Sequence, residues 1–153
     1  MPALFPGFTA LDRALAPYRE YGPLFIRLIV GHRLVWGTMD NVFSYAQMVE
    51  FVEFLGARGV PWPLGSAFIS AYAQFICGLL FVVGGFTRPA AAVMVFNFIA
   101  ALLIAHIGQP FLENYDALVM LFGSAFLLLH GPGAFSVDEA FSARAGTSSA
   151  PRG

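Results

Sequence analysis

The feature that most constrains this fold is an uncharged apolar stretch from Ala90 to Ile107, in which only Asn97 and His106 are polar. Its eighteen residues would rise about 27 Å as an α-helix, close to the roughly 30 Å hydrocarbon core of a bilayer. A helix suits lipid because it pairs its own backbone N–H and C=O groups. The stretch therefore predicts a membrane-spanning helix with other segments packed beside it.

The composition agrees with a membrane protein. The chain has 153 residues, of which 58% are hydrophobic and 11% are charged, whereas soluble domains carry about 25% charged residues. A soluble domain of this size lacks the interior to bury so much apolar surface. The net charge of −1 gives no reason to expect nucleic-acid binding. Cys77 has no cysteine to pair with, and no Cys/His group has the spacing of a metal site.

We predict an all-α, four-helix integral membrane bundle. The expected spans cover about residues 23–38, 66–86, 90–107 and 114–130, within a membrane domain of residues 23–141. The first span is the least apolar because it contains Arg27, His32 and Arg33. Arg27 lies near its start, from where it can snorkel to the headgroups. The favoured interpretation of Arg27, Arg88 and His130 is that they pair with other groups and hold the bundle together. Arg33 lies about 15 Å from the start of the helix, where a charge is expected to face protein and to pair with an acid or a carbonyl.

The segments outside the spans are expected at the membrane surface. Residues 1–22 carry Leu11, Leu15 and Tyr18 at helical spacing and predict a short interfacial helix. A second interfacial helix is expected at 42–55, between the first two spans. Ser136 to Glu139 suits the capped start of a short terminal helix, and residues 142–153 are expected to be a disordered tail.

The arginines predict the orientation. With four spans both termini share one side, and that side would hold most of the positive charge, namely Arg13, Arg19, Arg88, Arg144 and Arg152. The other side would hold only Arg58. Both termini are therefore expected in the cytoplasm.

Several motifs follow one another along the chain in a recognisable order. They are Arg27, GARGVPWP at 56–63, GLLFVVGGFTRPAAAV at 78–93, His106, Glu113 and LLHGPGAFSVD at 128–138. Together they resemble the DoxX family over roughly residues 24–140. The resemblance implies a four-helix bacterial membrane protein linked to thiosulfate:quinone oxidoreduction or to membrane oxidative-stress assemblies. The family usually places a glutamate in the middle of the second span, where this chain has Gln74.

A candidate polar site is expected at the outer end of the bundle, where His106 ends the third span and Glu113 and Asp116 begin the fourth. The connection is short, so the two helix ends should be close, and Arg33 would approach from the first span. Ionisable groups inside a membrane are functional candidates by default. Histidine can exchange a proton near neutral pH, and phenylalanines could line a slot for a flat quinone ring and its tail.

Two functions stay open. In the first, the chain is a quinone-interacting subunit of a redox or respiratory-type assembly. In the second, it is a non-catalytic accessory subunit that packs against a larger energy-transducing complex, and Arg33, His106, Glu113 and Asp116 only tie the spans together. Other partners expected are the lipid bilayer and membrane proteins or further copies of this chain.

Overall fold

The computed structural model describes residues 6–105 and 107–148, and it is helical throughout, with no strand in those two ranges. The elements in chain order are α1 (Pro6–Leu15), a 3-10 helix (Ala16–Tyr21), α2 (Gly22–Phe43), α3 (Tyr45–Ala57), α4 (Pro63–Val83), α5 (Thr87–Ala100), a π-helical segment (Ala101–Ala105), α6 (Phe111–His130) and α7 (Val137–Ser148). The predicted all-α class is confirmed.

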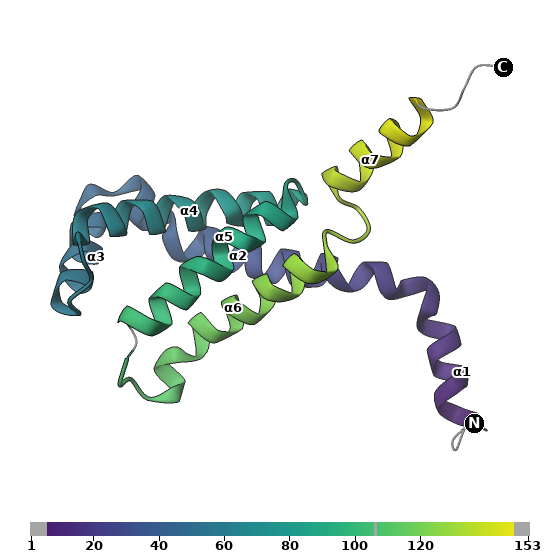
Figure 1. Cartoon of the computed structure of the whole chain (residues 1–153), viewed down its shortest axis with the longest axis horizontal. Helices are drawn as coiled ribbons and strands as arrows, with labels where there is room; N and C mark the ends of the chain where they lie inside the picture. Colours follow the sequence, from purple (N-terminus) through teal and green to yellow (C-terminus); the bar gives the residue numbers. More distant parts are fainter. Residues whose placement is uncertain (1–5, 106, 149–153) are drawn as a thin grey trace.

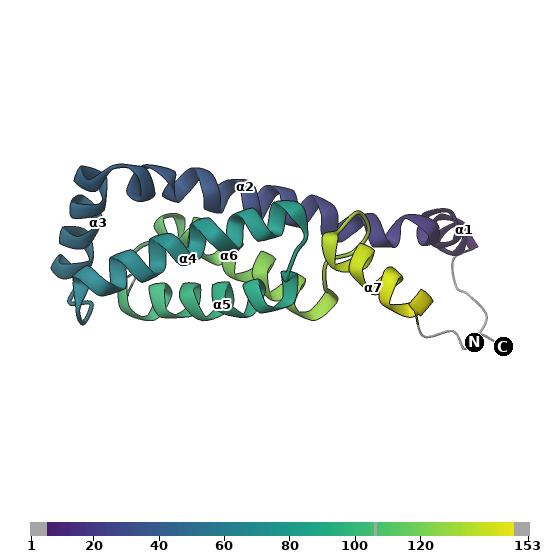
Figure 2. The same ribbon diagram turned by 90° about the horizontal axis from the view of Figure 1, so that it is seen from above.

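The helices α2, α4, α5 and α6 lie side by side and alternate in direction (Figures 1 and 2). The helix α3 lies across one end of this bundle, which we call the α3 end. At the opposite end, which we call the α7 end, α1 and α7 extend away from the bundle. The expected bundle with a crossing helix between its first two members is therefore present.

Three of the described helices are long and apolar enough to cross a membrane: Pro63–Val83, Thr87–Ile104 and Phe111–His130. Most of each helix faces outward, and the outward side chains include many large apolar groups, such as Phe25, Ile69, Phe96, Phe122 and Leu129. Such a surface suits lipid rather than water. The helix α2, with 22 residues, is long enough at about 33 Å, but its arginines and histidine make it less apolar than the other three.

Glycines bring α2 and α4 into close contact. A Cβ atom added at Gly31 would lie 2.8 Å from the carbonyl oxygen of Gly78, and one at Gly78 would lie 3.0 Å from that of Gly31. Small residues at such crossings let two backbones approach, which is how helices pack tightly in lipid. Gly123 of α6 lets Val30 of α2 approach in the same way, because a Cβ atom added at Gly123 would lie 2.6 Å from Val30 Cγ2. These glycines let α2 pack closely against both α4 and α6.

The core explains how α3 is held. One buried cluster fills the bundle, with Leu34, Phe81, Met94 and Leu127 among its members. A second cluster joins α3 to α4 through Met48, Leu55, Ala67 and Ala71. The small Ala67 and Ala71 side chains let α3 approach α4 closely. As a result α3 is docked on the bundle and forms one wall of the space described below.

Arg27 does not snorkel to the membrane surface but pairs with other groups of the bundle, as the favoured interpretation expects. Its side chain is 1% exposed. Nε donates to the carbonyl of Phe81 at 3.0 Å, and the two Nη atoms donate to the carbonyls of Pro132, Ala134 and Phe135 at 2.7, 3.3 and 3.0 Å. The loop after α6 supplies acceptors at the end of α4, so the guanidinium is satisfied by the protein rather than by headgroups.

Asp138 also joins distant segments. Its carboxylate accepts from the backbone N–H groups of Phe86 and Thr87 at 2.8 and 2.9 Å, at the start of α5. Anions are favoured there because the first N–H groups of a helix have no helical partner. The capped start expected for the last helix at Ser136 to Glu139 is present, because Ser136 Oγ accepts from the N–H of Glu139 at 3.1 Å.

Some predicted boundaries differ from the structure. The helix α2 continues to Phe43, and the end of the third span is π-helical over Ala101–Ala105. The disordered tail expected from residue 142 is wrong up to Ser148, because α7 runs to that residue. The Ser136 cap fixes the start of α7 and allows its helix to continue through an alanine-containing sequence. Residues 149–153 lie outside the described residues.

Candidate functional site

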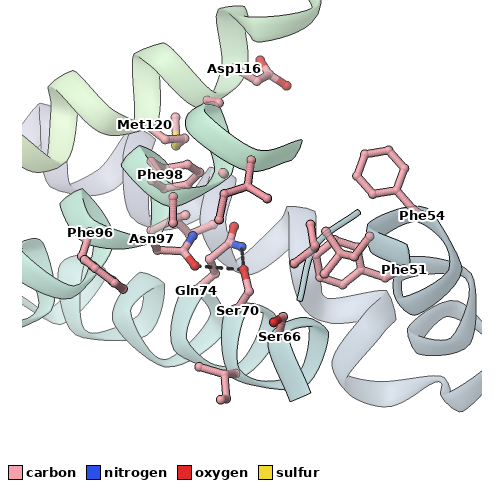
Figure 3. Close-up of a pocket in the computed structure, with 18 of the residues that line it drawn as sticks. Phe51, Phe54, Ser66, Ser70, Gln74, Phe96, Asn97, Phe98, Asp116 and Met120 are labelled. Carbon is pink, nitrogen blue, oxygen red and sulfur yellow. Dashed lines mark hydrogen bonds between the residues drawn. The ribbon is translucent and has the colours of Figure 1, made fainter. Parts of the chain in front are cut away.

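A cavity of about 510 Å³ lies toward the α3 end, between α2, α3, α4, α5 and α6. Its volume falls within the usual range for small-molecule sites, about 300–1,000 Å³. Much of its wall is aromatic or apolar, including Phe51, Phe54, Phe96, Phe98 and Met120 (Figure 3). Phe96 is also among the outward-facing side chains of α5, so the cavity borders the lipid-facing surface.

Three uncharged polar side chains meet inside this cavity. Ser70 Oγ donates to Asn97 Oδ1 at 2.9 Å, and Gln74 Nε2 donates to Ser70 Oγ at 2.9 Å (Figure 3). Ser70 and Gln74 are one turn apart on α4, and Asn97 faces them from α5. We call Ser70, Gln74 and Asn97 the polar triad. Among the described residues, Asn97 Nδ2 and the second N–H of Gln74 have no acceptor, so both groups can donate to a ligand.

A charged group borders the same cavity nearer the α3 end. Arg33 Nη2 donates to Asp116 Oδ2 at 2.6 Å, which joins α2 to α6. The side chains are 47% and 68% exposed, so Arg33 pairs with an acid as expected but is not enclosed by the bundle. Glu113, one turn before Asp116, lines the cavity as well. Figure 3 shows Asp116 apart from the polar triad.

Three of the four residues selected from the sequence therefore line one cavity: Arg33, Glu113 and Asp116. His106 lies outside the described residues. The sequence did not single out Ser70 and Asn97, although both carry a usable signal. Each is a polar side chain inside an otherwise apolar span, and intramembrane polar groups tend to face protein and one another.

The site can offer several kinds of contact to a ligand. The triad supplies amide and hydroxyl groups, Arg33 supplies guanidinium N–H groups, and Glu113 and Asp116 supply carboxylates. The aromatic walls can enclose a flat ring. Within residues 6–105 and 107–148, no group of three or more His, Cys, Asp or Glu side chains could hold a metal ion.

The fold and its apolar exterior define a multi-pass, all-helical membrane protein. The DoxX family model matches residues 22–107. The chain is also 32% identical, over 136 residues, to the inner membrane protein YphA of Escherichia coli (strain K12), covering 80% of this chain and 96% of that protein. This chain therefore belongs to the DoxX family, and it is a protein of the inner membrane. No solved structure matches it significantly.

Proposed function

We propose that this protein is a membrane subunit of a redox assembly and that its cavity binds a quinone. The observation that carries the proposal is the polar triad inside a largely apolar cavity, four of whose lining residues are phenylalanines, bordering the lipid-facing surface. A quinone is a flat, uncharged ring with two carbonyl acceptors and an apolar tail. Asn97 and Gln74 have N–H groups to donate to a carbonyl, and the phenylalanines can pack against the ring.

The charged residues near the α3 end have a separate role in this proposal. Reduction of a quinone to a quinol takes up two electrons and two protons, and we assign the electrons to a partner oxidoreductase. Glu113 and Asp116 are titratable groups lining the cavity and can pass protons toward a bound ring oxygen. The triad cannot do so readily because its groups are amides and a hydroxyl. Gln74 stands where the family usually has an acid, so proton transfer is assigned to the α3 end.

The test is a binding measurement on protein purified in mild detergent. We expect native quinone to be extracted from the wild-type protein and a decyl-substituted benzoquinone to bind after its removal. Gln74→Leu should weaken this binding at least tenfold, because it removes one donor and places an apolar group in the triad. The matched control is Gln47→Leu, which makes the same change on the exposed surface of α3 and should bind as the wild type does.

Two results would count against a quinone site. Equal binding by wild type and Gln74→Leu would exclude the triad. Stoichiometric partner subunits together with a cavity that takes up no quinone would favour the accessory role, in which the chain serves only to assemble a larger complex.

We also propose that both termini are cytoplasmic, from the arginine distribution. The structure has α1 and α7 at the same end of the bundle, which this orientation requires. Reporter fusions after Gly59 and after Gly153 should give opposite locations, with the second cytoplasmic. Two reporters on one side, or an external C-terminus, would contradict the proposal.

A further inference from the structure

A second cavity lies at the α7 end, between the start of α5, the end of α6 and α7, and its volume is about 860 Å³. Because α4 and α6 end and α5 begins here, the cavity sits where the apolar spans meet the membrane–water boundary. Phe86 and Phe141 line it and are 70% and 66% exposed. The cavity therefore combines access from water with apolar side chains next to the lipid.

The cationic group of this cavity is Arg88, at the start of α5. Arg88 Nη2 donates to the backbone carbonyl of His130 at a long 3.3 Å, and its guanidinium lies against Gly131. No carboxylate lies within ion-pair distance of Arg88 among the described residues. Its remaining N–H groups can therefore bind an external acceptor. The side chain of His130 lines the same cavity and stacks on Phe126.

The anionic groups come from the 3-10 helix before α2 and from α7. Glu20 and Glu139 line the cavity, and the structure records no hydrogen bond or ion pair to either carboxylate within the described part of the chain. Asp138 differs because its carboxylate already accepts from two backbone N–H groups. The cavity thus holds a guanidinium and two carboxylates that do not neutralise one another.

We propose that this cavity binds the headgroup of a zwitterionic phospholipid that carries a primary ammonium, as in phosphatidylethanolamine. A phosphate can take paired hydrogen bonds from the Arg88 guanidinium, and the ammonium can donate to Glu139 or Glu20. Phe86 and Phe141 lie where the first carbons of the acyl chains would pass. A purely anionic headgroup carries no ammonium, so it would bring a further negative charge close to the carboxylates of Glu20 and Glu139. A choline headgroup has no N–H to donate to these carboxylates. This site is independent of the proposed quinone cavity.

The experiment is lipid competition on the delipidated full chain, read by native mass spectrometry. The protein is offered equal amounts of phosphatidylethanolamine, phosphatidylcholine and phosphatidylglycerol with identical acyl chains. We expect at least fivefold preference for phosphatidylethanolamine over each of the others. Arg88→Gln should reduce its binding at least tenfold, whereas Glu139→Gln, which removes one of the two carboxylates, should lower the preference over both phosphatidylcholine and phosphatidylglycerol.

The control is Arg58→Gln, which removes an arginine that lies over the Phe54 ring at the α3 end and should leave lipid binding unchanged. Glu139→Gln keeps the test valid if Arg88→Gln fails to fold, since no recorded contact depends on that carboxylate. Preferred binding of phosphatidylglycerol, or unchanged selectivity in Glu139→Gln, would overturn the proposal. So would displacement of the lipid by soluble glycerophosphoethanolamine at the same concentration, because a lipid site requires the acyl chains to contribute.

Discussion

The two ends of the bundle use their charged and polar side chains differently. At the α7 end, Arg27 donates to four backbone carbonyls and Asp138 accepts from two backbone N–H groups. Both side chains link segments far apart in the sequence. Toward the α3 end, Arg33 and Asp116 bind each other in an exposed position, and the polar triad borders a cavity. Arg27 and Asp138 are thus bound to backbone groups, whereas Arg33, Asp116 and the polar triad present their side chains to a cavity.

This difference separates scaffold from site among the residues that carry the family resemblance. Gly84 belongs to the motif at 78–93 and Asp138 to the motif at 128–138, and the side chain of Arg27 lies between these two segments. All three residues make their contacts with the protein itself. These contacts therefore hold the α7 end of the fold together. The quinone chemistry proposed here depends on the cavity toward the α3 end, where Gln74 belongs to the polar triad.

The largest loss of folding stability is expected when the side chain of Arg27 at the α7 end is removed. Arg27→Leu would leave buried carbonyls of Phe81 and the 132–135 loop without a donor, at a cost of at least about 3 kcal/mol of folding free energy. The measurement is thermal unfolding in detergent. The control is Arg33→Leu on the same helix, which should lose less than about 1 kcal/mol because its ion pair is exposed. Similar losses in the two variants would remove the distinction between the ends.

Two glycines, one at each end of the bundle, should differ by a smaller amount in the stability cost of an alanine substitution. Gly84 has a φ of +69°, and an added Cβ would lie 2.7 Å from both Arg27 Cζ and Ser136 Cβ. Gly84→Ala should therefore cost about 1–3 kcal/mol. At the α3 end, the nearest atom to a Cβ on Gly56 is Pro63 Cγ at 3.6 Å, an ordinary contact. Gly56→Ala should leave stability unchanged or raise it slightly. Equal melting temperatures for both variants would contradict the described packing.

Replacing Asp138 should lower the folding stability by a moderate amount. Asp138→Ala removes the acceptor for two N–H groups at the start of α5, which should cost about 0.5–2 kcal/mol. Asp138→Asn keeps one oxygen acceptor and should lose less. The comparison is made by chemical denaturation of the two variants in one detergent. If Asn is as damaging as Ala, the charge matters rather than the hydrogen bonds, and helix-dipole stabilisation would replace capping as the explanation.

The smallest effect is expected for the exposed pair. A double-mutant cycle with Arg33→Gln and Asp116→Asn should give a coupling of less than about 1 kcal/mol, since neither side chain is enclosed by the protein, their exposed fractions being 47% and 68%. A coupling of several kcal/mol would mean that this ion pair contributes to folding stability as Arg27 does. Arg33 and Asp116 would then also be structural residues.

The sequence predicted the all-helical membrane bundle because long uncharged runs have few other stable forms in lipid. It also selected Arg33, Glu113 and Asp116, since charges near a span are easily seen. It could not predict the burial of Arg27, whose acceptors lie 54 and 105–108 residues away. Periodicity reports the face of one helix, not which carbonyls a distant loop will present. The triad was missed for a similar reason, because Ser70 and Asn97 meet only after α4 and α5 have packed.

The most direct measurement of the central claim is the melting temperature with and without the decyl-benzoquinone, for the wild type, Gln74→Leu and Asp138→Ala. A ligand that binds only folded protein raises that temperature. We predict that Gln74→Leu melts close to the wild type without ligand but gains little from it, whereas Asp138→Ala melts lower and gains as much as the wild type. Loss of the gain in Asp138→Ala together with its retention in Gln74→Leu would contradict the assignment of Asp138 to the scaffold and of Gln74 to the quinone site.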